Sequence, residues 1–204
     1  LNTGYYTRDP VFAELVRHAK RMGYVLVPYE PASGPDQTQQ ARETGMAEIL
    51  AKVLSTSPQT KLLVHAGYSH IGESRHGLPD SAKPMAMELA RISGLALLTV
   101  DQTTTRSYET DDIDTIGRQL AHRFALTEPS VLIAREDGRA WSSTPGRFDA
   151  SALLPSTSTA LRPNWLELEG RRRATAVDFA PCIERLPCLV EARYATEGDD
   201  AIPA

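Results

Sequence analysis

Two histidines and a tyrosine directly follow the short apolar segment Lys61–Val64, within the stretch KLLVHAGYSHIGE at Lys61–Glu73. Histidine and tyrosine side chains can transfer protons, donate hydrogen bonds or bind metals. Lys61–Val64 has the length and composition of a strand, and the polar residues begin where it ends. In open parallel sheets, ligands bind beyond the carboxyl ends of the strands. We therefore expect His65, Tyr68 and His70 to lie at a functional site.

Further polar residues are expected at the same edge of the sheet. Glu30 ends the apolar segment Tyr24–Tyr29, and Asp101 and Gln102 end the segment Leu95–Val100. The carboxyl ends of neighbouring parallel strands share one edge, so these side chains would lie beside the histidines.

A charged pair, Arg42 and Glu43, lies in line with apolar residues of a predicted helix. Arg42 precedes Met46 by one helical turn, and Glu43 is in line with Ala47 and Leu50. Side chains at these spacings share a face of the helix. A charge on a buried face is costly unless it has a partner, so the pair is expected to point at a site or at opposite charges.

Six of the candidates also have a structural interpretation that the sequence leaves open. These are a helix cap or loop residue for Glu30, hydrogen-bonded loop anchors for His65 and His70, surface charges for Arg42 and Glu43, and a cap of the following turn for Asp101.

Strands and helices alternate along the first two thirds of the chain. Amphipathic spacing predicts helices over 10–22, 37–54, 83–92 and 113–125, and apolar runs predict strands over 24–29, 61–64, 95–100 and 131–134. The alternation predicts an α/β fold with right-handed crossovers, in which helices flank a parallel sheet in βαβαβ order. The apolar runs at 24–29 and 95–100 favour strands that are covered on both faces. Asp137-Gly138 predicts a β-hairpin.

The amino-acid composition changes at Arg147. Ser, Thr and Pro dominate 151–163, and short strand-like pieces follow at 165–168, 174–179 and 189–192. We expect an α/β domain over 1–146, incomplete at its N-terminus, and a β-rich C-terminal extension over 147–204.

The composition excludes some classes of partner. The net charge of −4 argues against nucleic-acid binding, which needs a basic surface. No apolar run reaches the ~18 residues that a membrane-spanning helix requires. The expected partner is a small-molecule substrate or ligand.

Two cysteines, Cys182 and Cys188, are each preceded by a proline. They fit a small disulfide loop in an oxidising compartment or two free thiols. We slightly favour a periplasmic or secreted location over a cytoplasmic one. The chain starts at Leu1 rather than Met, so we expect a fragment or a processed product.

The central part of the chain resembles the second half of the erythromycin-esterase/ChaN-like/TraB superfamily. The resemblance covers roughly 24–102: Arg42-Glu43-x-x-Met46-Ala47 stands in the family's helix motif, Gly67-Tyr68-Ser69-His70 in its Gly-x-x-His turn, and Glu30 in its acidic position. The family's opening strand with a Gly-Glu-x-His-type motif has no counterpart before Tyr24.

The resemblance implies an α/β fold with a site of His, Glu and Arg side chains, while functions in the superfamily range from ester hydrolysis to haem binding. We expect a hydrolase in which His70, Glu30, Arg42 and Glu43 are catalytic and His65, Tyr68, Asp101 and Gln102 bind substrate. A divalent metal, with His70 and Glu43 as ligands, is one cofactor alternative. Haem or iron in a non-catalytic binding domain is another, and a degenerate domain in which these residues are structural is a third.

Overall fold

The computed structural model describes residues 6–32, 34, 36–104, 116–155, 170, 173, 176, 178, 180–183 and 194–198. The chain divides into two compact units, one formed by Leu1–Val27 with Thr157–Ala204 and the other by Pro28–Ser156. The expected strands at 165–168 and 189–192 lie outside the described residues, as does most of 174–179.

The unit that contains the N-terminus is built on the helix α1 (Pro10–Arg21), which η1 (Tyr6–Arg8) precedes. Asp9 caps α1, since its carboxylate accepts hydrogen bonds of 2.9 Å from the backbone N–H groups of Val11 and Phe12. The short helix α5 (Ala180–Ile183) belongs to the same unit and includes Cys182, which is disulfide-bonded. Cys188 lies outside the described residues.

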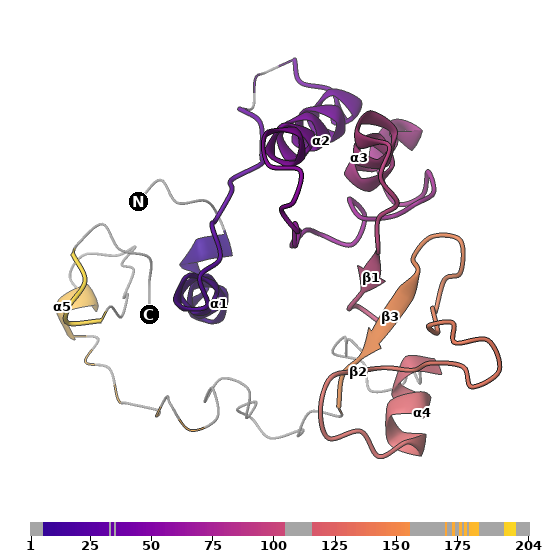
Figure 1. Ribbon diagram of the computed structural model, residues 1–204. Helices are drawn as coiled ribbons and strands as arrows, with labels where there is room; N and C mark the ends of the chain where they lie inside the picture. Colours follow the sequence, from indigo (N-terminus) through magenta and orange to yellow (C-terminus); the bar gives the residue numbers. More distant parts are fainter. Residues whose placement is uncertain are drawn as a thin grey trace. The chain divides into compact units, whose positions relative to one another are not determined.

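In the unit Pro28–Ser156, the helices α2 (Gln39–Thr56) and α3 (Met85–Ser93) pack side by side (Figure 1). Their N-termini meet, because the side chains of Gln40 and Glu43 accept hydrogen bonds from the backbone of Lys83 and Met85. The C-terminal ends of both helices line a common cavity. The two helices therefore run parallel, as helices on one face of an α/β sheet do.

The main core lies between these helices and the segments beside them. Its buried residues are Met46, Ala47, Leu50, Met85 and Leu89, and partly buried residues that include Tyr29, Leu62, Val64, Ala66 and Leu97 pack against them.

The predicted strands at 61–64 and 95–100 are covered on one face in the described structure. Leu62, Val64 and Leu97 contact the helical core, whereas Leu63 is 78% and Leu98 is 77% exposed. The expectation of coverage on both faces was therefore wrong for 95–100, since α2 and α3 pack on a single face of it, and for 24–29, where Val25 is 87% exposed.

A small mixed sheet forms the remaining part of this unit. It has the order β1 (Val100–Asp101), β3 (Ala150–Leu153), β2 (Ser130–Val131), with β1 parallel and β2 antiparallel to β3. Helix α4 (Ile116–Arg123) contacts β3 (Figure 1), and η2 (Pro79–Ser81) precedes α3. The predicted α/β character is confirmed at this level.

Regular strands are fewer than the sequence predicts. The described residues 24–29 and 61–64 carry no strand, and only Val100 of 95–100 lies in one. The predicted hairpin at Asp137-Gly138 is confirmed by an antiparallel bridge between Ile133 and Ala140, with Gly138 at a φ of +71°.

Candidate functional site

A buried carboxylate forms the centre of the candidate site. Glu43 lies in the second turn of α2, and its side chain is fully buried. Its Oε1 and Oε2 lie 2.7 and 2.9 Å from Nδ1 of His70. Oε2 also accepts a 2.8 Å hydrogen bond from the backbone N–H of Met85, and Oε1 accepts one from Nε2 of Gln39. The buried charge is thus satisfied by three donors.

Two elements hold His70 in place. Its backbone N–H donates to the Gly67 carbonyl at 2.9 Å, which closes the turn after the expected strand. Its carbonyl accepts a 3.0 Å hydrogen bond from Ala86 at the start of α3. The His70 side chain is 18% exposed, and its ring edge (Cδ2) lies 3.4 Å from the place a Cβ would take at Gly67. With Nδ1 bound to Glu43, Nε2 is the ring atom left for a ligand.

The unpaired N–H groups at the N-terminus of α3 explain why the Glu43 carboxylate is buried beside this helix. The residue before the helix is Pro84, whose side chain offers no hydrogen bond to the helix, so the first N–H groups of α3 need other acceptors. Glu43 and the His70 carbonyl supply them. The positive end of the α3 dipole also favours a carboxylate at this position.

Glu30 and Arg42 form an ion pair beside the buried carboxylate. Nη2 of Arg42 lies 3.1 Å from Oε2 of Glu30, and Nε contacts Oε1. The hydrogen bond to Glu30 raises the pKa of Arg42 above its ordinary value, and the charges of Glu30 and Glu43 raise this pKa further while burial opposes them. Arg42 is therefore paired with Glu30 while its side chain remains 35% exposed to solvent.

Tyr29 adds a link that the sequence did not reveal. Its hydroxyl donates a 2.6 Å hydrogen bond to the His65 carbonyl and so connects two predicted strand ends. Burial raises the pKa of Tyr29, and the Glu30 and Glu43 charges add to this rise, while Arg42 lowers it. The segments around Tyr29 and His65 therefore meet near the Arg42 pair.

The other predicted substrate-binding residues lie in different surroundings. Asp101 is buried and accepts hydrogen bonds from the Thr103 backbone and from the hydroxyls of Thr103 and Thr104, which makes it the cap of its own turn. Gln102 is exposed. Among the described residues, no hydrogen bond or ion pair joins either residue to His70, and their role in binding stays a prediction.

The donor set does not fit a metal site. All contacts of Glu43 are with N–H groups, and the described residues include no group of three His, Cys, Asp or Glu side chains that could hold an ion. The haem alternative stays a prediction.

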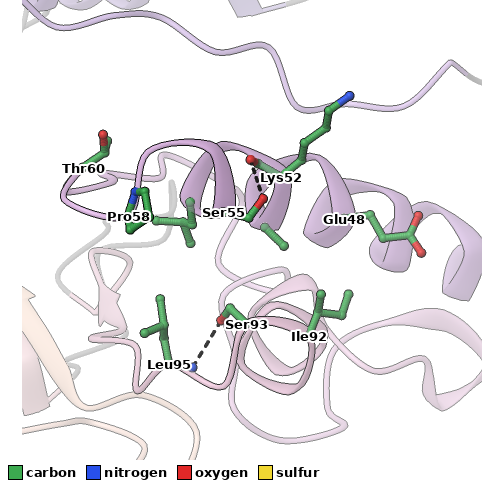
Figure 2. A pocket seen from close by; sticks show the side chains of 10 residues that line it. Glu48, Lys52, Ser55, Pro58, Thr60, Ile92, Ser93 and Leu95 are labelled. Atoms are coloured by element: carbon green, nitrogen blue, oxygen red, sulfur yellow. Dashed lines mark hydrogen bonds between the residues drawn. The ribbon is translucent and has the colours of Figure 1, made fainter.

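A cavity of about 610 Å³ lies away from this site, between the C-terminal halves of α2 and α3 (Figure 2). Figure 2 shows Lys52 and Ser55 of α2 opposite Ile92 and Ser93 of α3. Glu43 lies five residues before Glu48, the lining residue of α2 nearest to it, roughly 7.5 Å along the helix axis. The cavity lining offers no histidine and no arginine, so it is separate from the candidate chemistry.

Comparison with protein-family models, with curated proteins and with solved structures found no match. In the part of the chain that the structure describes, no helix is long and apolar enough to span a membrane.

Proposed function

We propose that this protein is a hydrolase of esters in which His70 is the general base and Glu43 orients it. The observation that carries the proposal is the fully buried Glu43 carboxylate bound to Nδ1 of His70. A carboxylate on one imidazole nitrogen fixes the tautomer, so the other nitrogen can accept a proton. The resemblance to erythromycin esterases points to the same class of reaction.

The reaction needs only a water molecule as co-substrate. Nε2 of His70 takes a proton from water while the water oxygen forms a bond to the ester carbonyl carbon. The tetrahedral intermediate then collapses, the bond to the alcohol oxygen breaks, and the imidazolium returns its proton to that oxygen. Glu43 stabilises the imidazolium between the two proton transfers.

Arg42 is the proposed stabiliser of the negative charge that develops on the carbonyl oxygen. Glu30 holds its Nε and Nη2, which leaves Nη1 for a substrate oxygen. Glu30 would thus position Arg42, while Tyr29 and His65 fix the edge on which this pair lies. No step is assigned to a metal, because Glu43 is fully occupied by N–H donors.

We propose further that the segments 61–64 and 95–100 are neighbouring parallel strands of a βαβαβ sheet. The support is the packing of Leu62, Val64 and Leu97 on the same helical core, together with the parallel course of α2 and α3. In such a sheet His70 would follow the carboxyl end of its strand, where ligands of α/β proteins bind.

The test is hydrolysis of a panel of aryl and alkyl esters by the wild-type protein and the variant His70→Asn. The Asn amide can keep a hydrogen bond to Glu43 but has no base at the position of Nε2. We expect kcat/KM to fall by about 10²-fold or more with the melting temperature nearly unchanged. His122→Asn, an exposed histidine of α4, is the matched control and should keep full activity.

A structural role is the second candidate, and the Glu43–Met85 hydrogen bond favours it. In that case Glu43 and His70 only cap α3, the wild-type protein hydrolyses no ester of the panel, and replacing His70 by Ala lowers stability and nothing else. Full turnover by His70→Asn would equally contradict the hydrolase proposal.

A further inference from the structure

The guanidinium of Arg147 lies against aromatic rings and glycines beside the loop that follows His70. Its Cζ lies 5.5 Å from the ring centre of Tyr68 and 5.1 Å from that of Phe148. Its Nη2 donates a 3.1 Å hydrogen bond to the His76 carbonyl. Contacts of this kind stabilise a cation without neutralising it.

Two glycines make room for this side chain. A Cβ at Gly77 would lie 2.5 Å from Nη2 of Arg147, and one at Gly72 would lie 3.4 Å from Nε. Gly77 also has a φ of +85°, a backbone conformation that favours glycine. The loop is therefore shaped around the guanidinium.

The charge of Arg147 has no carboxylate partner in the described structure. Arg17 and Arg42, which are also partly buried, each pair with a glutamate, whereas no ion pair includes Arg147. Its Nε is buried and has no hydrogen-bond acceptor. A buried donor without an acceptor is unfavourable, and so is a cation partly removed from water. An oxyanion bound at the guanidinium would offset the cost of its unpaired charge.

The surroundings of Arg147 connect it with the candidate active site. Ser69 and Tyr68 directly precede His70, and Oγ of Ser69 lies 3.2 Å from the same Cβ position at Gly77 that Nη2 approaches. No hydrogen bond of the Ser69 hydroxyl is found among the described residues. Tyr68 is 45% exposed, so solvent reaches this corner of the site.

We propose that Arg147, together with the Ser69 hydroxyl, binds an oxyanion group, a carboxylate or a phosphate, that the substrate carries. The planar guanidinium matches two oxygens of such a group, and the aromatic rings hold its plane in place. The assignment of this anion to the substrate rests on the proposed hydrolase function. Oxyanion binding at Arg147 does not.

The binding test is a titration of the wild-type protein with inorganic phosphate and, separately, with acetate. Chloride keeps the ionic strength constant, and NMR follows Nε–H of Arg147 and the amides of His76 and Gly77. We expect the NMR chemical shifts to change and saturate with at least one of the two anions. The anion that binds more tightly shows whether the site prefers a phosphate or a carboxylate. Arg147→Met should abolish saturation, while Ser69→Ala should weaken binding about fivefold through loss of one hydrogen bond.

Arg75→Met is the matched control, since Arg75 is an exposed arginine of the same loop. This variant should bind the anion as the wild-type protein does. If the shifts do not saturate in the wild-type protein, or if Ser69→Ala and Arg75→Met have equal effects, the proposed site is wrong. If Arg147→Met fails to fold, the comparison of Ser69→Ala with Arg75→Met still tests the proposed anion site.

The substrate assignment is tested with two aryl esters of one shape, phenyl acetate and 4-acetoxybenzoate, and with the phosphate analogue 4-acetoxyphenyl phosphate. We expect the wild-type protein to prefer an anionic ester by about tenfold or more in kcat/KM, and Arg147→Met to lose this preference while still hydrolysing phenyl acetate. An equal loss of kcat/KM for all three esters in Arg147→Met would overturn the assignment of the anion to the substrate. It would not contradict the proposed hydrolase function. If the wild-type protein hydrolyses none of these esters, the proposed hydrolase function fails, and with it the assignment of the anion to an ester substrate. The titration still decides independently whether Arg147 binds anions.

Discussion

At the scale of single residues, Glu43 has two roles, one in the candidate site and one in the stability of α3. The same carboxylate holds Nδ1 of His70 and completes the N-terminus of α3 through Met85. A substitution at Glu43 therefore changes stability as well as chemistry. A substitution at His70 that keeps the hydrogen bond separates the two effects.

The site residues could be predicted to different degrees. Alignment with the apolar stripe of the helix indicated that Glu43 points inward, and the structure buries it fully. Asp101 has the alternative role of a turn cap, which the sequence left open. Arg147 gave no signal of its own, because its neighbours at Tyr68 and His76 are more than 70 residues distant in the chain.

Glu73 allows a prediction about pH at this scale. Burial raises its pKa, the hydroxyl of Thr99 lowers it, and the nearby Asp149 raises it again. The folded state thus binds this proton more tightly than the unfolded state, so Glu73 destabilises the protein increasingly as pH rises from its unfolded pKa of about 4.3 through its higher folded value.

Glu73→Gln should therefore raise the melting temperature at pH 7, and the gain should shrink toward pH 4. Thermal unfolding followed by circular dichroism across this range measures it. Glu136→Gln, at an exposed position of the hairpin turn, serves as the control. A variant that is less stable than the wild-type protein at pH 7 would show that the Thr99 hydrogen bond outweighs the cost of burial.

At the scale of elements, helices were more predictable than strands. Asp9-Pro10 and the apolar stripes are local signals, and the predicted helices correspond to α1, α2, α3 and α4 where their residues are described. Strand pairing depends on distant residues: β1 pairs with β3 through Val100 and Ala150, far apart in the sequence. Ala150–Leu153, expected in the C-terminal extension, thereby joins the sheet of the preceding residues.

The hairpin of residues 133–140 gives a prediction about an element. Gly138 occupies a φ of +71°, which L residues adopt only at a cost, and nothing lies within 4 Å of its Cβ position. Gly138→Ala should therefore lower the free energy of unfolding by about 1 kcal/mol through backbone strain alone. Urea denaturation measures this loss.

Gly34→Ala is the matched control, because its Cβ position is equally open and its φ is not in the left-handed region. This change should be neutral or slightly stabilising. Equal effects at both glycines would contradict the assigned turn.

At the scale of the whole molecule, a cluster of side chains joins the two ends of the chain within one unit. Arg17 of α1 binds both oxygens of Glu197 at 2.9 and 2.7 Å, and its Cζ lies 4.9 Å from the ring centre of Tyr194. The Tyr194 hydroxyl in turn donates to Glu14 at 3.2 Å. The segment 194–198 is thus attached to α1 by contacts that span 180 residues of sequence.

This cluster should respond to acid. The hydrogen bond from Arg17 lowers the pKa of Glu197, so the ion pair contributes stability above the unfolded pKa of a glutamate and loses it as pH falls through the lower folded value. An NMR titration of the Glu197 carboxyl should give a midpoint below about 4.3, and Arg17→Gln should return it toward that value.

Arg139→Gln, an exposed arginine paired with Asp137 in the other unit, is the control and should leave the Glu197 midpoint unchanged. A Glu197 midpoint that is unaffected by Arg17→Gln would contradict the attachment of this segment to α1.

The most direct measurement for the central claim is a double-mutant cycle on ester hydrolysis with Glu43→Gln, His70→Asn and the combined variant. Groups that act as a unit lose activity non-additively. We predict that each single change lowers kcat/KM by about 10²-fold or more and that the double variant is no slower than His70→Asn alone. Losses that multiply, or full activity in His70→Asn, would contradict a Glu43-oriented histidine base.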